Sequence, residues 1–207
     1  MSIKVKICGI KTLAISRASI KYGADFLGFN FVPTSKRLIS ASDAKKIIDS
    51  LPKNRRPLCV GVFMNQNQNE VKKILDKVPL DILQFHGNES PGFCRSFHLP
   101  YIKAFGLGLN TSVASLIKQM GRYRPKFFLL DRAEQGRGSQ VDLKKIMQLA
   151  KQFPVFLAGG LNPKNIKSSL AQAGKIKGVD VAGGVEIHGK KNLSKIKNFI
   201  QLSKLST

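Results

Sequence analysis

The chain has 207 residues, 43% of them hydrophobic and 23% charged, and carries a formal net charge of +23. This length suits one well-packed domain, and the composition has neither the bias of a disordered chain nor that of a membrane protein. No apolar run approaches the ~20 residues of a membrane span, and the first residues lack the apolar core of a signal peptide, so we expect a cytoplasmic protein with no membrane partner.

Short runs rich in β-branched and aromatic residues recur along the whole chain. Between them lie segments with apolar residues at helical spacing, as in 44–51, 71–78 and 193–200. Regular alternation of strand and helix predicts parallel strands joined by right-handed crossovers, covered by helices on the outer face. The eight predicted strands are Ile3–Ile7, Phe26–Phe29, Leu58–Phe63, Ile82–Phe85, Tyr101–Phe105, Phe127–Leu130, Val155–Leu157 and Val179–Val181.

Eight such units can close into a barrel, whereas a doubly wound open sheet usually has fewer strands and a nucleotide-binding glycine loop after the first. Here the first strand is followed by Cys8-Gly9-Ile10-Lys11, which is not such a loop. We therefore predict an α/β fold, a single-domain (β/α)8 TIM barrel that spans residues 1–207. In such a barrel, reactive groups lie at the carboxyl ends of the strands.

Two residues at strand ends are candidates for catalysis. Cys8 closes the first strand, where a thiol would face the barrel mouth; the alternative is a small buried apolar residue, as most free cysteines are. Asp131 ends the sixth strand, and a role at the mouth is favoured because burying an unpaired carboxylate is expensive. Cys59 and Cys94 fall within a strand and a helical stretch, which indicates packing.

Two glycine pairs, Gly159-Gly160 and Gly183-Gly184, follow the seventh and eighth strands. Barrels of this kind bind phosphate at these two loops, because glycine lets backbone N–H groups approach the anion. The alternative is that the glycines only make tight turns. Two pairs in the two expected loops favour a phosphorylated small molecule as the partner.

Of four further polar residues, three have more than one interpretation. Arg37, after the second strand, could pair with a substrate carboxylate or belong to the surface. His86, after the fourth strand, could be an acid, a base or a turn residue. Asp180, within the eighth strand, must be hydrogen-bonded and could either orient a neighbour or contact substrate. Asp25 opens the second strand and is predicted to lie on the opposite, stabilising face.

Other classes of protein find little support. The three cysteines form no CxxC pair, and no HExxH or Gly-x-Ser-x-Gly motif occurs, so we predict neither a metal site nor a serine hydrolase. A strongly basic chain could bind nucleic acid, but the lysines and arginines are spread along the sequence and form no basic arm. Solvated basic helix faces are the more common explanation, and no nucleic acid partner is expected.

The strand ends and the loops after them carry a series of motifs over the whole chain. The motifs are Lys6-Ile7-Cys8-Gly9, Gly23-Ala24-Asp25-Phe26-Leu27-Gly28-Phe29, Ser35-Lys36-Arg37, Val60-Gly61-Val62-Phe63, Gln84-Phe85-His86-Gly87, Leu129-Leu130-Asp131, Ala158-Gly159-Gly160-Leu161-Asn162-Pro163 and Gly178-Val179-Asp180-Val181. Taken in order, they resemble the motif series of the phosphoribosylanthranilate isomerases. The resemblance implies an Amadori rearrangement without a cofactor, in which Cys8 is the general base and Asp131 the general acid. It also implies that Arg37 clamps the anthranilate carboxylate and that Gly160, Gly183 and Gly184 lie in the phosphate loops.

The chain departs from the family pattern in three places. Gln135-Gly136-Arg137-Gly138 replaces a G-G-T-G loop, and Leu143 replaces a frequent aromatic residue after it. Ala182-Gly183 replaces two serines in the last loop, which removes two hydroxyl donors; Arg137 is a candidate to compensate with its charge. Asn192 replaces a common Asp near a helix start, where it concerns capping.

Two rival functions remain open at this stage. The first is another phosphosugar isomerase or epimerase on the same barrel, since phosphate loops do not define the rest of the substrate; Cys8 and Arg37 argue against it. The second is a catalytically silent barrel whose charge binds a polyanion, with strongly salt-dependent binding as its signature. The helix-face patterns permit either a monomer or a homodimer, and the high net charge favours the monomer.

Overall fold

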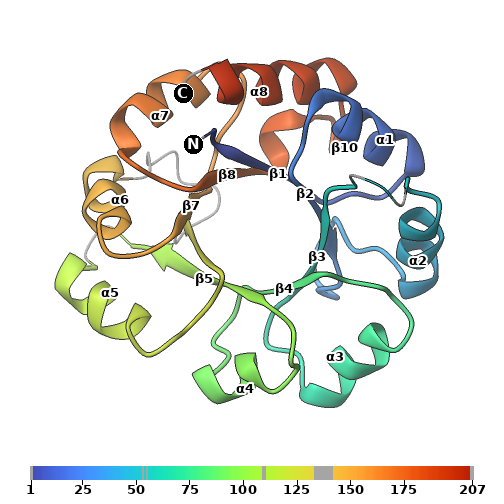
Figure 1. Ribbon diagram of the computed structural model, residues 1–207, viewed down its shortest axis with the longest axis horizontal. Coiled ribbons are helices and arrows are strands. Elements are labelled where there is room, and N and C mark those ends of the chain that lie inside the picture. The colour runs from blue at the N-terminus through green and yellow to red at the C-terminus, as the bar shows by residue number, and fades with distance from the viewer. Residues whose placement is uncertain (1, 53, 55, 109–110, 133–141, 206–207) are drawn as a thin grey trace.

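The computed structural model of the chain describes residues 2–52, 54, 56–108, 111–132 and 142–205. Its parallel strands form one closed barrel in the order β1 to β8, surrounded by a ring of helices (Figure 1). The predicted (β/α)8 barrel is therefore confirmed. The barrel strands are β1 (Lys4–Cys8), β2 (Phe26–Asn30), β3 (Leu58–Phe63), β4 (Ile82–Phe85), β5 (Tyr101–Leu107), β6 (Phe127–Arg132), β7 (Val155–Leu157) and β8 (Gly178–Val181).

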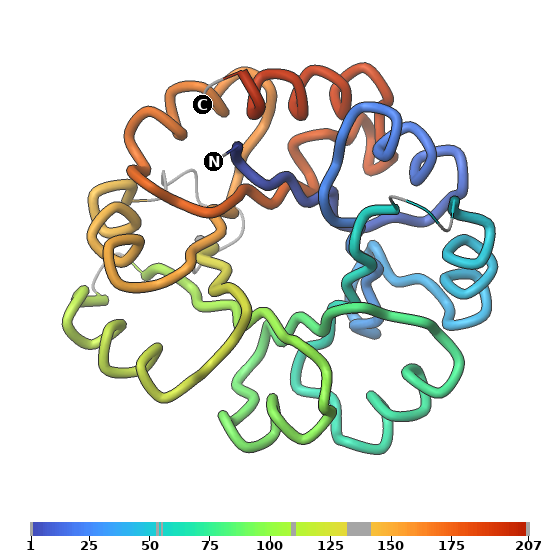
Figure 2. Tube along the Cα trace, in the orientation of Figure 1, coloured from blue at the N-terminus to red at the C-terminus, as the bar shows by residue number. Residues whose placement is uncertain are grey.

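Each barrel strand is followed by a helix on the outside, and the tube in Figure 2 shows how the chain runs around the ring once from β1 to the last helix. The last crossover also holds a 3-10 turn, η1 (Gly183–Val185), and a small antiparallel hairpin of β9 (Glu186–Ile187) and β10 (Lys190–Lys191). The helices are α1 (Leu13–Tyr22), α2 (Ala41–Asp49), α3 (Gln68–Leu75), α4 (Pro91–Arg95), α5 (Val113–Met120), α6 (Leu143–Ala150), α7 (Ile166–Ala173) and α8 (Leu193–Leu205).

Polar residues at the ends of the βα turns start most of these helices. Side chains of Thr12, Ser40 and Asn67 accept hydrogen bonds from backbone N–H groups in the first turns of α1, α2 and α3. Such caps satisfy donors that a helix start leaves open. Asn192 does the same for α8, where Lys195 N donates to its Oδ1 at 3.0 Å, in agreement with the capping role expected for it.

Apolar side chains fill both faces of the strands. The larger core lies between the strands and the outer helices. Inside the barrel, Phe26, Phe127 and Phe156 pack with ring centroids 4.7 to 6.0 Å apart. Because Phe26 and Phe127 are the first residues of β2 and β6, this packing closes the amino-terminal end of the barrel. Within the described residues, this packing leaves the carboxyl end as the open end of the barrel, where such enzymes bind their ligands.

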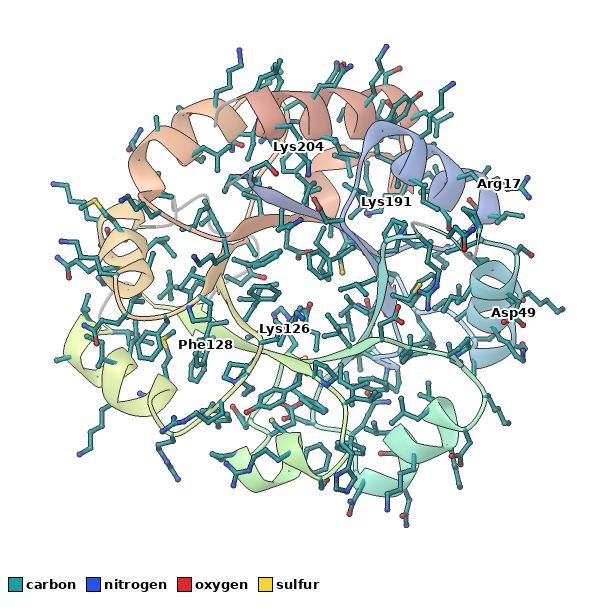
Figure 3. The ribbon with its side chains drawn as sticks, in the orientation of Figure 1. Arg17, Asp49, Lys126, Phe128, Lys191 and Lys204 are labelled. Carbon is teal, nitrogen blue, oxygen red and sulfur yellow. The ribbon has the colours of Figure 1, made fainter. Side chains whose placement is uncertain are left out.

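The amino-terminal end is further held by ion pairs. Asp25 accepts from Lys4 Nζ at 2.9 Å, from Lys204 Nζ at 2.6 Å and from Val5 N at 2.9 Å, which confirms its expected place on the stabilising face. In Figure 3, Lys204 lies on α8, while Arg17 and Asp49 lie on the outer rim of the helix ring. Within the part of the chain that the structure describes, no helix is both long and apolar enough to cross a membrane.

Candidate active site

Two adjoining cavities open at the carboxyl ends of the strands. The larger, of about 1010 Å³, is lined by His86 and Phe105 among others, and the smaller, of about 290 Å³, is lined by both glycine pairs and Asp180. Three residues line both cavities: Lys36, Arg37 and Asp131. An elongated molecule with a different group at each end could therefore occupy both cavities, with its middle part next to Asp131.

Asp131 lies near the end of β6 and has a side chain that is 19% exposed. Its Oδ2 is 3.6 Å from Nε2 of His86, and the other ring nitrogen, Nδ1, is 3.0 Å from Nε2 of Gln84. Burial lowers the pKa of His86, although the Asp131 charge opposes this shift. A neutral His86 that accepts from the Gln84 amide carries its hydrogen on Nε2, facing Asp131.

Cys8 is the last residue of β1 and is buried, with 7% of its surface exposed. It packs with Val32, Val62 and Ala182. Val32 and Val62 line the larger cavity and Ala182 lines the smaller one, so Cys8 packs against residues of both cavities. Opposite it, a Cβ on Gly28 would lie 2.9 Å from the Cys8 sulfur, which shows that glycine is needed there to leave room for the thiol.

Beneath Cys8, a buried ion pair joins the first and last strands. Lys6 is fully buried, and its Nζ donates to Oδ1 of Asp180 at 2.8 Å. Burial alone would lower the pKa of Lys6, but the nearby Asp180 and Cys8 raise it well above its usual value. Lys6 is thus a permanent cation in the barrel interior, and one oxygen of Asp180 is committed to holding it.

Sequence reasoning assigned no role to Lys6, although a signal was present. Successive side chains of a strand point to opposite faces, so Lys6 and Cys8 share a face of β1. A charged residue on the inward face needs a buried partner, and the aspartate in the apolar eighth strand was the obvious candidate.

The glycine pairs bring the two last loops into close contact. Gly159 and Gly160 have φ values of 87° and 71°, in the left-handed region that favours glycine. A Cβ on Gly184 would lie 1.8 Å from the backbone oxygen of Leu161, and a Cβ on Gly183 would lie 3.2 Å from Nη2 of Arg37. The loops after β7 and β8 therefore form one small cradle with the arginine at its edge, as an anion site requires.

Arg37 reaches the cradle from the loop after β2 and meets Glu186. Its Nε and Nη2 donate to the two carboxylate oxygens at 2.7 and 2.8 Å, and Lys191 Nζ donates to Oε1 at 2.8 Å. Burial alone would raise the pKa of Glu186, but these hydrogen bonds outweigh it and lower the pKa to about 2. Glu186 and Lys191 had no role assigned from the sequence, although Glu186 follows the glycine pair Gly183-Gly184 by two residues.

A second buried ion pair supports the segment that carries His86. Lys103 Nζ donates to Oε2 of Glu89 at 3.0 Å and to the backbone oxygens of Phe85 and Gly87. Both charged side chains are nearly inaccessible, at 2% and 3% exposure. Since His86 lies between these two backbone contacts, the pair fixes the backbone on either side of it. Neither residue was singled out from the sequence.

The sequence also raised the questions of a metal site, of the other two cysteines and of Arg137. Among the described residues, no cluster of three or more histidine, cysteine or acidic side chains could hold a metal ion. Cys59 and Cys94 are fully buried, as packing residues should be, and burial raises the pKa of their thiols to about 12 and about 11. Arg137 and the loop 135–138 lie outside the residues that the structure describes.

A closed barrel with a glycine cradle after its last two strands, beside a carboxylate and a buried thiol, is typical of an enzyme that acts on a phosphorylated small molecule. The family model for N-(5'-phosphoribosyl)anthranilate isomerase matches residues 5–202. The chain belongs to this family of isomerases.

Individual relatives agree with this placement. The N-(5'-phosphoribosyl)anthranilate isomerase of Desulforudis audaxviator is 43% identical, with 97% of each chain covered. The crystal structure of the phosphoribosylanthranilate isomerase of Thermotoga maritima is 34% identical, with a TM-score of 0.85 and 98% of each chain covered. A further isomerase structure, in complex with reduced 1-(o-carboxyphenylamino)-1-deoxyribulose 5-phosphate, is also 34% identical, with a TM-score of 0.83 and 98% of each chain covered.

Proposed function

We propose that this isomerase converts N-(5'-phosphoribosyl)anthranilate into 1-(2-carboxyphenylamino)-1-deoxyribulose 5-phosphate, a step of tryptophan biosynthesis, by acid–base catalysis alone. The observation that carries the proposal is the position of Asp131, which borders both the glycine cradle and the larger cavity. A phosphate bound by Gly159, Gly160, Gly183 and Gly184 and an aromatic ring in the larger cavity would leave the sugar beside this carboxylate.

The proposed reaction consists of proton transfers. Protonated Asp131 gives its proton to the ring oxygen of the ribose, the bond between C1' and that oxygen breaks, and the nitrogen lone pair forms a protonated Schiff base. The Cys8 thiolate then removes the proton from C2', and the electron pair of that bond neutralises the iminium to give an enolamine. Tautomerisation of the enolamine gives the ketone. Fixed anion sites at both ends of the substrate would hold it in reach of the acid and the base.

The other site residues have supporting roles in this proposal. Arg37 contacts an anionic group of the substrate from the boundary between the cavities. His86 lies beside Asp131 and keeps the acid oriented toward the sugar. Asp180 acts chiefly through Lys6, whose charge lies next to the Cys8 thiol.

The decisive experiment follows the decay of anthranilate fluorescence in enzymatically generated substrate, with a metal chelator present. Cys8→Ser and Asp131→Asn variants, shown to be folded by circular dichroism, are assayed beside the parent. We expect rapid turnover by the parent and loss of about 10²-fold or more in each variant. A folded parent that binds phosphate and does not turn over this substrate would refute the proposal and point to another phosphosugar.

We also propose that the protein acts in the cytoplasm, since an anionic metabolite does not diffuse through a bilayer. Its partner is then the phosphorylated substrate and not nucleic acid, and salt-dependent binding of random DNA at micromolar concentration would contradict this. One of the similar crystal structures is of a dimeric isomerase from Thermotoga maritima in a monomeric form. We propose a monomer for this chain because of its net charge, and light scattering on the purified protein distinguishes it from a homodimer.

A further inference from the structure

The side chain of Arg37 follows a narrow path between two glycines. A Cβ on Gly9 would lie 2.5 Å from Cδ of Arg37, and one on Gly183 would lie 3.2 Å from its Nη2. Gly9 belongs to the loop after β1 and Gly183 to the turn after β8. A larger residue at either position would displace the arginine side chain. Its conformation therefore depends on the loops after β1, β2 and β8.

At the end of the path, Glu186 occupies one edge of the guanidinium. The carboxylate takes the Nε and Nη2 hydrogens in a bidentate pair at 2.7 and 2.8 Å. A guanidinium has five N–H donors in a planar fork. Among the residues that the structure describes, only Glu186 accepts from this side chain, so the edge formed by Nη1 and the second hydrogen of Nη2 can take another planar anion. Because Glu186 fixes the plane of the group, it also fixes the direction in which this second edge points.

Glu186 is itself held from several sides. Lys191 Nζ donates to its Oε1 and to the backbone oxygen of Ala182, both at 2.8 Å, and Lys195 Nζ donates to the Glu186 backbone oxygen at 2.9 Å. The side chains of Glu186 and Lys191 are 8% and 6% exposed. Lys191 is the last residue of β10 and lies inside the helix ring (Figure 3). Burial lowers the pKa of Lys191 and Glu186 opposes this shift, so each charge depends on the other.

The same short segment carries the glycine cradle. Glu186 follows Gly184 by two residues, and the Ala182 oxygen bound by Lys191 precedes the cradle directly. The arginine and the cradle are therefore joined through one network of hydrogen bonds, which fixes the distance between them. A second bidentate pair, Arg56 with Asp81, serves as a contrast: it lies just before β3 and β4, at the opposite end of the barrel.

We propose that Glu186, held by Lys191, is a positioning residue that turns the free edge of Arg37 toward an anionic group of the substrate. The inference rests on the proposed function only in the identity of that substrate. Arg37 makes the contact, and Glu186 acts through it without touching the substrate. The spacing between the arginine and the cradle then becomes part of how the site selects a molecule with two anionic groups.

The test is a double-mutant cycle with Glu186→Gln, Arg37→Ala and the combined variant, and with Asp81→Asn as the matched control. We expect Glu186→Gln to raise KM about 10-fold while kcat changes by less than about threefold, because a remote binding contact is lost. In the Arg37→Ala background the same substitution should add less than about twofold, since the two residues act as one unit. Asp81→Asn should lower the denaturation midpoint and leave KM unchanged.

Calorimetric binding of a product analogue, reduced 1-(o-carboxyphenylamino)-1-deoxyribulose 5-phosphate, separates this proposal from the proposed function. A parent protein that binds the analogue but does not turn over the substrate would overturn the proposed function. The same double-mutant cycle, measured as affinity for the analogue, would still decide the role of Glu186. Lys191→Met provides a second variant should Glu186→Gln fail to fold, with an expected weakening of about threefold. Independent, multiplying effects of Glu186 and Arg37, or an Asp81→Asn variant with an equally raised KM, would overturn the positioning role.

Discussion

Lys103→Met is the substitution whose effect can be worked out most fully from the structure. The ammonium donates three hydrogen bonds, to Glu89 Oε2 at 3.0 Å, Gly87 O at 2.5 Å and Phe85 O at 3.3 Å, and its side chain is 2% exposed. Methionine has a similar length but no charge and no donor. The change leaves a carboxylate and two carbonyl oxygens buried without this partner.

Removal of one member of a buried ion pair typically costs about 3–5 kcal/mol. Glu89 keeps hydrogen bonds from Asn65 N at 2.8 Å and Gly87 N at 3.0 Å, so we expect the lower end, about 3 kcal/mol of unfolding free energy. The chain contains no tryptophan, so urea unfolding is best followed by far-UV circular dichroism. The double variant Lys103→Met/Glu89→Gln should recover part of the loss, because the unpaired charge is gone.

The same substitution has an expected kinetic effect. Lys103 binds the backbone on both sides of His86, so kcat should fall even at temperatures where the variant is fully folded. A loss of less than about 1 kcal/mol in Lys103→Met, or a double variant no more stable than the single one, would refute the reasoning that the pair is a buried charge network.

Three further predictions concern single groups. Gly184→Ala should lower the free energy of unfolding by about 1–3 kcal/mol and weaken inhibition by inorganic phosphate, because the added Cβ would lie 1.8 Å from a backbone oxygen. The control is Gly92→Ala in α4, where the nearest atom is 3.9 Å from the added Cβ and the change should be neutral or stabilising. Equal urea midpoints for the two variants would contradict this prediction. The pKa of Glu186 is lowered from 4.5 to about 2, so its contribution to stability is complete above pH 4.5 and is lost as the pH falls toward 2. The difference in unfolding free energy between the parent and Glu186→Gln should therefore become smaller as the pH falls over that interval. A difference that does not change with pH would show that the charge of Glu186 does not stabilise the fold. With their raised pKa values and full burial, Cys59 and Cys94 should not react with a thiol reagent at neutral pH until urea is added; rapid modification of either thiol in the folded protein would show that it is accessible.

The strands were predictable because each is a short run rich in apolar residues, even where a charged residue such as Lys6 or Asp180 interrupts it. Leu58–Phe63, Ile82–Phe85 and Val155–Leu157 have the predicted bounds. The other strands differ by one or two residues at their ends, as at Tyr101–Leu107, where the last residues pair with β6 at the barrel rim. Strand pairing in the closed barrel, and not the apolar pattern, decides those last residues.

The hairpin of β9 and β10 was not predicted, since strands of two residues leave no periodic pattern. In the structure, His188 and Gly189 have φ values of 49° and 75°, and two successive positive values are typical of the turn in a two-residue hairpin. The sequence His188-Gly189 does not predict this turn, because Asn and Asp are the residues usually found at its first position. The hairpin matters because it brings Lys191 to Glu186.

The candidate site was predictable where chemistry and strand ends coincide, as for Asp131, whose surroundings match the expected barrel mouth. The supporting charges were not, because their partners are distant in the sequence. Lys6 and Asp180 are 174 residues apart, and Arg37 and Glu186 are 149 apart. A single sequence shows that a charge is present in an apolar strand, and only barrel closure shows which residue neutralises it.

The pairing of β1 with β8 has a consequence for synthesis on the ribosome. At roughly 5–20 residues per second, the 174 residues between Lys6 and Asp180 take about 9–35 s to translate. During this time β1 has no β8 to pair with, and Lys6 lacks Asp180. Until β8 is synthesised, other parts of the nascent chain or a chaperone must cover the unpaired edge of β1.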